Sequence, residues 1–342
     1  MKDPYLTPEP YLFERVAMRP TPRTWAKHII LLLVTFLTAT IAGTLFPFGV
    51  IQSLPEGDPQ SWGEVANFIA SIPIRYASFI AYVLHEIATN QHILVYGLSF
   101  SVSLLFILIS HEMGHYVACR LYGVDATLPY FIPTPPLIGP AGTFGAFIKI
   151  LSPMPSRRAV FDIGLAGPLA GFVALIPIAI IGIATMETIS PQQAANFVSP
   201  IVFSDPLLLK GIALAFGKNL QFGIGNPFYF AAWVGLLVTA LNLIPSGQLD
   251  GGHAIYSVFG ARVHRWTGII AFVLMATLSI LGWFLFGSPS GFLIAVLLGV
   301  MMRIKHPQPH DQSPLDAKRK AIAFLALVVF VLCFVPFPIQ LN

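Results

Sequence analysis

The sequence predicts an all-α polytopic membrane protein, and its composition, its apolar runs and the placement of its charges point to this class. Of the 342 residues, 56% are hydrophobic and only 10% are charged, whereas soluble domains carry about 25% charged residues. A soluble chain this apolar could not cover its own surface, but helices that face lipid require such a composition. The formal charge of +4 gives no indication of nucleic-acid binding, so we expect membrane lipid around the chain and no nucleic acid.

Apolar runs long enough to cross a hydrocarbon core, which takes about 20 residues, recur along the chain. We expect about seven transmembrane helices, at residues 29–46, 93–119, 160–184, 228–249, 266–286, 290–303 (short) and 320–338. Residues 64–92 are interrupted by Pro73 and Arg75, and we expect them to form a non-spanning or shallow segment on the outer side. A Pro- and Gly-rich stretch at 120–158 is too polar to span, and there we expect a small membrane-associated β-hairpin or Gly-rich loop.

The basic residues orient these spans, because Lys and Arg are enriched on the cytoplasmic side of membrane proteins. With a cytoplasmic N-terminus and seven crossings, 16 of the 19 basic residues fall inside, and only Arg75, Lys210 and Lys218 fall outside. A further crossing at residues 64–92 would destroy this partition. We therefore expect a cell (plasma or inner) membrane protein with a cytoplasmic N-terminus and an active site that opens toward the cytoplasm.

A metal-binding motif lies within the second expected span. His111, Glu112 and His115 form an H-E-x-x-H sequence, HEMGH, which is expected only roughly 0.005 times by chance in a chain of this composition. Positions i and i+4 share one face of a helix, so both imidazoles can bind one zinc ion while Glu112 contacts a water molecule. Ionisable residues inside a membrane are costly and usually functional. The alternative is a solvated helix end that contains His and Glu without binding metal.

A catalytic zinc takes three protein ligands and keeps one open position, so a third ligand must come from another segment. His111 lies about nine residues before Arg120, or roughly 13 Å from that end of its helix. Asp250 lies about 22 residues into the span that starts near Phe228, at a similar depth near the cytoplasmic side. His253 is the rival ligand. With only Cys119 and Cys333 in the chain, no cysteine-based zinc site is expected.

The HEMGH motif, followed about 125 residues later by NLIPSGQLDGG, resembles the site-2 protease family of intramembrane zinc metalloproteases (peptidase family M50). The Gly-rich segment at 139–146 and the small-residue helix at 161–171 resemble the family as well. The likeness extends over roughly residues 93–260. Together with the expected spans, it divides the chain into a cytoplasmic tail (1–26), a first transmembrane helix with the outer segment (27–92), a site-2 protease-like catalytic core (93–260) and C-terminal transmembrane helices (261–342).

The resemblance implies one Zn²⁺ held by His111, His115 and Asp250, with Glu112 as the general base. It implies cleavage of peptide bonds in or near the transmembrane segments of membrane proteins, within regulated intramembrane proteolysis. The substrate is then a transmembrane protein, such as an anti-sigma-factor-like or other single-pass signalling protein. Asn242 matches a family position that contacts the substrate or the reacting carbonyl. Many bacterial members carry a PDZ domain, but residues 185–227 are too few for one here.

The Gly-rich segment could also hold the substrate. A helix hides its amides and carbonyls in hydrogen bonds, so a substrate helix must unwind, and an exposed strand edge can bind an extended chain. Residues 139–151 combine glycine with strand-forming side chains, and from them we expect contacts from Gly142, Thr143, Phe144 and Gly145. The alternative is an ordinary interfacial loop. The glycines at 164, 167 and 171 are expected to serve helix packing.

Three other functions remain open from the sequence. A membrane metal-ion transporter could also place His and Glu within a span, but it needs a polar path through both halves of the bilayer. Another class of integral metalloprotease would use a Glu as the third ligand, and Glu187, the only Glu after Glu112, is expected on the outer side. An inactive scaffold with a relic motif would not need the complete ligand set.

Overall fold

The computed structural model describes residues 19–52, 61–195, 200–304 and 309–341, so most of the expected cytoplasmic tail lies outside the described residues. The helices among them are α1 (Pro22–Thr44), α2 (Trp62–Thr89), α3 (Gln91–Leu121), α4 (Arg157–Ala184), α5 (Pro191–Ala195), α6 (Leu207–Ala215), α7 (Pro227–Leu243), α8 (Asp250–Phe259), α9 (Ala261–Phe286), α10 (Ser290–Met301) and α11 (Ala317–Cys333). The strands are β1 (Tyr130–Pro133), β2 (Thr143–Phe147), β3 (Glu187–Thr188), β4 (Ile201–Phe203), β5 (Gly223–Ile224) and β6 (Ile339–Leu341).

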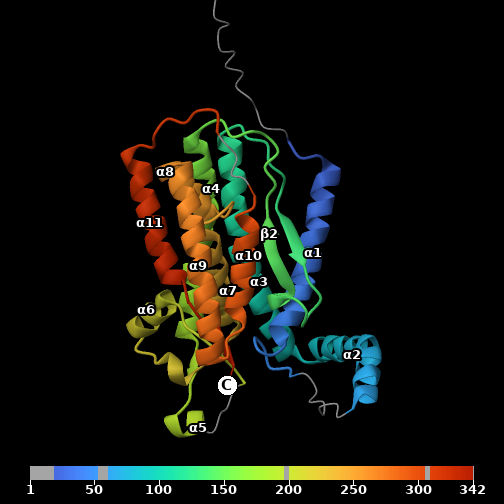
Figure 1. Cartoon of the computed structure of the whole chain (residues 1–342). Helices are drawn as coiled ribbons and strands as arrows, with labels where there is room; N and C mark the ends of the chain where they lie inside the picture. The colour runs from blue at the N-terminus through green and yellow to red at the C-terminus, as the bar shows by residue number, and fades with distance from the viewer. Residues whose placement is uncertain (1–18, 53–60, 196–199, 305–308, 342) are drawn as a thin grey trace, which may run out of the picture.

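The long helices run alongside one another as a bundle, and α2 crosses its lower end (Figure 1). Among the described residues, five helices are long and apolar enough to cross a membrane, namely α1, α2, α3, α4 and α9. The all-α membrane class is thus confirmed. Three of the expected spans are shorter, because α7 and α11 each have 17 residues and α10 has 12. The expected number of seven spans is not confirmed and stays a prediction.

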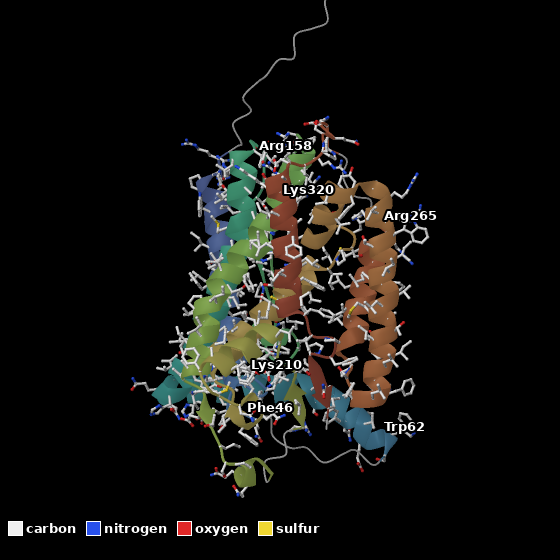
Figure 2. All side chains as sticks on the ribbon, turned by 90° about the vertical axis from the view of Figure 1, so that its left-hand side faces the viewer. Phe46, Trp62, Arg158, Lys210, Arg265 and Lys320 are labelled. Carbon is white, nitrogen blue, oxygen red and sulfur yellow. The ribbon has the colours of Figure 1, made fainter. Side chains whose placement is uncertain are left out.

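The two ends of the bundle differ in the basic residues that mark them. Figure 2 shows Arg158, Lys320 and Arg265 toward one end, and Phe46, Trp62 and Lys210 toward the other. Lys210 was one of the three basic residues assigned to the outer side, so this separation agrees with the charge partition. The end that carries Arg158 is called the basic end below.

Close approach of α3 and α4 forms the centre of the bundle. A side chain at Gly114 on α3 would meet the carbonyl group of Ala166 on α4, and one at Gly171 on α4 would press on His111. Small residues let the backbones of two membrane helices come close together, which agrees with the packing role expected for Gly171. Fully buried Phe100, Leu165, Leu175 and Leu236 continue the apolar core between α3, α4 and α7.

The expected hairpin after the motif helix is present as β1 and β2. The two strands pair antiparallel, with Tyr130 opposite Phe147 and Pro133 opposite Thr143. The pairing continues beyond β2, because the amide of Thr127 donates to the carbonyl of Lys149 and the amide of Leu151 donates to that of Asp125. Residues 143–151 therefore form one extended segment. One of its edges pairs with β1 and with residues 125–127.

The stretch from α4 to α7 contains short elements of its own. Strand β3 pairs with β5, and β4 pairs with β6 from the C-terminal part of the chain. Asn219 caps a short 3₁₀ turn (Leu220–Phe222), and Asn226 caps α7 by accepting from the amide of Tyr229 at 2.9 Å. These elements close the end of the bundle that lies opposite the basic end.

Helix α2 is long enough to span, yet it lies across the other helices (Figure 1). Only 6% of the residues in its most apolar stretch are buried inside the molecule. Its second half packs on the end of α1 and the start of α3 through Val83 and Phe79. The crosswise direction supports the expectation that residues 64–92 do not cross the bilayer.

We expect cysteines introduced at Trp62 and His92 to be labelled from the same side of the membrane. Both positions are exposed, since Trp62 begins α2 and His92 lies just after its end, and we predict that this helix lies in the membrane plane. The measurement is labelling with a membrane-impermeant maleimide in intact and inverted vesicles, in a background with Cys119 and Cys333 replaced. Lys320→Cys at the basic end serves as the control and should react from the opposite side. Labelling of Trp62→Cys and His92→Cys from opposite sides would refute the in-plane position.

Candidate metal centre

Three ligand-type side chains meet inside the bundle. His111 and His115 lie one helical turn apart on α3, and Asp250 at the start of α8 lies against both. His111 is 3% exposed and His115 is 7% exposed. The structure thus brings together the three residues expected to bind zinc, from segments more than 130 residues apart in the sequence.

A break between α7 and α8 delivers Asp250 to this place. The sequence predicted a span through residue 249, but α7 ends at Leu243, because Pro245 lacks an amide hydrogen and keeps Ile244 out of the helical region. The chain then turns back sharply, so that a side chain at Gly251 would meet the carbonyl of Leu243 and one at Gly252 that of Gly247. Asp250 is therefore the first residue of a new helix rather than the last of a long one.

The three ligand atoms fit a zinc ion in spacing and in chemistry. His111 Nε2 and His115 Nε2 lie 3.2 Å apart, and Asp250 Oδ2 lies 3.4 Å from each of them. A tetrahedral site with bonds of about 2.0–2.1 Å has ligand separations of about 3.3–3.4 Å. Two neutral imidazoles and one carboxylate form a donor set typical of catalytic zinc, and three protein ligands leave a fourth position open.

Helix α4 holds the ring of His115 in the orientation that a metal requires. The Nδ1 atom of His115 lies 2.7 Å from the carbonyl oxygen of Ile163. Since a carbonyl oxygen can only accept, Nδ1 carries the proton and the lone pair of Nε2 remains for the metal. The ring rests on Gly167, where any Cβ would overlap it.

Glu112 lies beside this ligand triangle without belonging to it. One of its carboxylate oxygens is 4.0 Å from His111 Nε2, and the residue is 6% exposed. The backbone amide of Ile148, just after β2, donates a hydrogen bond to the carboxylate. Glu112 is therefore close enough to contact a water molecule at the open position, as expected for a general base.

Asn242 and a cavity complete the site. The Asn242 side-chain nitrogen lies 3.2 Å from His111 Nε2, so the residue expected to contact the reacting carbonyl is beside the ligands. A cavity of about 520 Å³ opens in front of them, and its lining includes Asn242, Gln248 and His253. His253 lies outside the triangle formed by the three ligand residues. Cys119 is buried in an apolar cluster with Val124 and is not a ligand.

The residues expected to bind substrate fall into two groups in the structure. Gly142 packs against Thr38 of α1, and buried Thr143 bonds to the carbonyl of Ile132, so both fix the hairpin in place. Phe144 is 63% exposed and Gly145 faces open space. The cavity itself is lined by the next stretch, residues 146–150.

The sequence does not distinguish residues 146–150 from the rest of the segment. Which edge of a strand stays open depends on the side that its partner strand occupies, and a sequence does not show that side. Lys149 and Leu151 direct their backbone groups toward residues 125–127. Successive residues of a strand point these groups to opposite edges, so those of Ile148 and Ile150 face the other way. The Ile148 amide accordingly points to Glu112. The open edge of the strand therefore faces the metal centre.

The family model of peptidase family M50 matches residues 99–281, which is more than half of the chain and includes α4, α7, α8 and most of α3 and α9. This chain belongs to peptidase family M50. The matched segment contains His111, His115 and Asp250 together with Glu112 and Asn242, so the candidate metal centre lies within the part of the chain that the family model matches. A zinc ion is the cofactor that this family and donor set imply.

Relatives of this M50 chain are named as probable zinc metalloproteases. It is 28% identical over 335 residues to probable zinc metalloprotease EGY1, chloroplastic, of Arabidopsis thaliana, covering 95% of this chain and 56% of the relative. It is 30% identical over 285 residues to probable zinc metalloprotease EGY2, chloroplastic, of the same plant, covering 81% of this chain and 48% of the relative. The chain thus spans about half the length of the curated relatives it matches.

We expect Gly167→Ala to lower the zinc affinity of the purified protein by at least about 10-fold, the lower end of what is lost when the support of a metal ligand is removed. The added methyl group would occupy the space of the His115 ring and displace Nε2. The measurement is competition with a chelator of known affinity. Gly211→Ala on α6, where an added Cβ has no atom within 4 Å, should bind zinc like the wild type. Unchanged zinc affinity in Gly167→Ala would contradict this account of the ring's position.

Proposed function

We propose that this protein is an intramembrane zinc endopeptidase that cleaves peptide bonds in or near the transmembrane segments of membrane proteins. The observation that carries the proposal is the triangle of His111, His115 and Asp250, with tetrahedral spacing and Glu112 beside it, inside a bundle of apolar helices. A centre inside a bundle of apolar helices is difficult for a soluble peptide to reach. A substrate that is itself embedded in the membrane already lies beside it.

The residues around the centre suit hydrolysis. Zinc, when bound, supplies a Lewis acid that lowers the pKa of a water molecule toward about 7 and polarises a carbonyl group. Glu112, held by the Ile148 amide, takes a proton from the attacking water and passes it to the leaving amine. The side-chain amide of Asn242, next to His111, donates to the negative charge that develops on the carbonyl oxygen.

The strand edge beside the centre gives the substrate a place to unwind. A helical segment hides its peptide groups, whereas an extended one can pair with the open edge of residues 146–150. That edge lies along the cavity that contains Glu112. The extended substrate would then pass between the hairpin and the metal centre, with its scissile carbonyl next to Asn242.

The proposal extends to a class of substrate and to a membrane. A single-pass signalling protein, such as an anti-sigma-factor-like protein, is the proposed partner, because it offers one transmembrane helix to a centre that lies among apolar helices. The basic end of the bundle is proposed to face the cytoplasm of a cell membrane, together with the N-terminus. The cavity lining includes Lys149 and Ser152, which lead to the start of α4 at that end, so water would reach the centre from there.

We expect Glu112→Gln to bind zinc like the wild type and to lose cleavage by about 10²–10⁴-fold, the usual contribution of a general base. Glu112 is not one of the three ligands, so the metal content should not change. The measurements are zinc content of the purified protein and membrane-protein fragments in cells carrying either form. Zinc transport without any proteolysis by the wild type would favour the transporter alternative.

We expect a photoreactive amino acid at Phe147 to cross-link a transmembrane substrate trapped by the Glu112→Gln form. Phe147 ends β2, lines the cavity and is 46% exposed. The matched control is the same replacement at Phe284 on α9, which is 80% exposed and should give only background. The measurement is the yield of the covalent adduct on a denaturing gel. Equal yields at both positions would contradict binding at the strand edge.

A further inference from the structure

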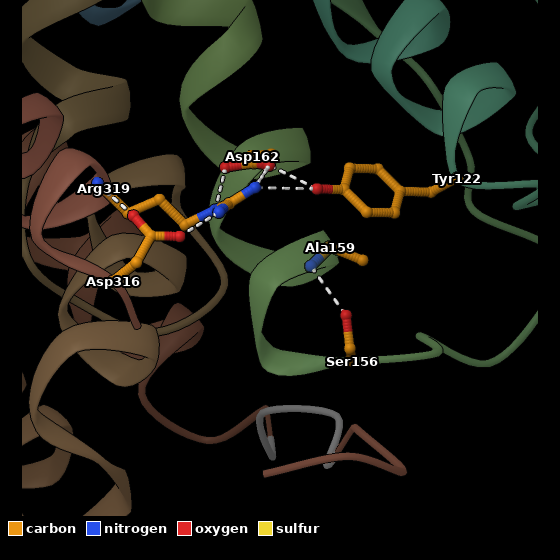
Figure 3. A network of polar contacts seen from close by, with 6 residues as sticks. All are labelled: Tyr122, Ser156, Ala159, Asp162, Asp316 and Arg319. Atoms are coloured by element: carbon orange, nitrogen blue, oxygen red, sulfur yellow. Dashed lines mark hydrogen bonds and ion pairs between the residues drawn. The ribbon is translucent and has the colours of Figure 1, made fainter. Parts of the chain in front are cut away.

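One arginine outside the matched family segment joins three helices at the basic end of the bundle (Figure 3). Arg319 lies in the first turn of α11 and bonds to Asp162 of α4 with two nitrogens, Nε to Oδ1 at 2.9 Å and Nη2 to Oδ2 at 2.5 Å. Its Nη2 is also 3.2 Å from the hydroxyl of Tyr122. That hydroxyl in turn donates to Asp162.

Tyr122 brings the motif helix into this network. It is the residue that follows α3 directly and caps it, with its amide donating to the carbonyl of Ala118. Burial, together with the neighbouring Asp162, raises the pKa of Tyr122 above its ordinary value, so the hydroxyl keeps its proton and remains a donor. The end of α3 is therefore fixed to the start of α4.

Asp162 is one residue before Ile163, and Ile163 is the residue whose carbonyl oxygen accepts from Nδ1 of His115. Arg319 thus acts on both sides of this hydrogen bond. Through Tyr122 it holds the helix that carries the His115 donor, and through Asp162 it holds the helix turn that carries the acceptor. A shift of α4 along α3 would lengthen the bond and free the His115 ring.

The side chain of Arg319 is itself held in place from its own helix. Asp316 caps α11 by accepting from the Arg319 amide at 2.9 Å, and its other oxygen accepts from the Arg319 guanidinium. Ser156 caps α4 by accepting from the amide of Ala159 at 3.1 Å, which fixes the turn that contains Asp162. The planar guanidinium of an arginine, once its orientation is fixed, sets the distance between its hydrogen-bond partners. The flexible ammonium group of a lysine does not.

We propose that Arg319 is a positioning residue for the metal centre, holding α4 against α3 through Asp162 and Tyr122 so that the Ile163 carbonyl keeps His115 Nε2 directed at the zinc. The proposal rests on the proposed function only in taking His111, His115 and Asp250 as the zinc ligands. It assigns a role in metal binding to α11, which follows the segment that the family model matches.

The test measures metal binding in the full-length purified protein. Zinc affinity is obtained by chelator competition, and the visible spectrum of the Co²⁺-substituted protein reports the geometry of the ligands. We expect Arg319→Gln to bind zinc about 10-fold more weakly, at the lower end of the effect of partners that orient a ligand, and to show an altered Co²⁺ spectrum. Arg319→Lys should recover only part of the affinity. Lys320→Gln, an exposed charge removed from the same helix end, should match the wild type.

Asp162→Asn provides a second variant on the other side of the contact. It should reproduce the spectrum of Arg319→Gln, and the double variant should bind zinc no more weakly than either single one, because the two residues act as a unit. Should Arg319→Gln fail to fold, Asp162→Asn and Arg319→Lys decide the matter by the same measurements.

Wild-type zinc affinity and an unchanged Co²⁺ spectrum in folded Arg319→Gln would overturn the proposal, even if its thermal stability were reduced. The measurements do not depend on proteolysis. A wild type that binds zinc but cleaves no peptide would therefore refute the proposed function and leave the role of Arg319 intact.

Discussion

The close contact between α3 and α4 is the constraint on which the rest of the structure depends. The ring of His115 occupies the space that a side chain at Gly167 would fill, and its Nδ1 bonds to a backbone carbonyl of the same helix. Inside an apolar bundle an imidazole without a partner is costly. The hydrogen bond from His115 to the backbone of α4 offsets the cost of burying the imidazole. It also fixes the orientation of the ring, because the accepting carbonyl cannot move independently of α4.

The break after α7 satisfies a second requirement, that of bringing a carboxylate to the two histidines. Irregular backbone at membrane depth is tolerated only where protein buries it or where it lines a cavity. Here Ile244 and Ser246 are buried, and Gln248 and Leu249 line the cavity. With two neutral imidazoles and one carboxylate, the ligand set carries a single negative charge, so a bound Zn²⁺ leaves a centre with a charge of only +1.

The sequence was sufficient to predict those parts of the site that follow from local periodicity. The spacing of His111 and His115 gave the shared helix face, and depth counting placed Asp250 beside them, although it arrives on a separate helix. The hairpin was foreseen, but not which of its edges is open, since this depends on residues 125–127 pairing with 149–151. Nothing in a single sequence indicates that Arg319 and Asp162, which are 157 positions apart, form an ion pair, or that the Ile163 carbonyl accepts from His115.

The shortness of α10 has a consequence for the surrounding bilayer. Its 12 residues are about 18 Å long at 1.5 Å per residue, against a hydrocarbon core of about 30 Å. If α10 crosses the bilayer, as the sequence predicts, the lipid next to so short a helix is drawn inward and the membrane becomes thinner there. A neighbouring peptide segment would then meet headgroups and water deeper than in an undisturbed membrane, and its exposed amides would cost less to uncover. The deformation of the lipid would thereby contribute to the melting of a helix before any residue of the protein touches it.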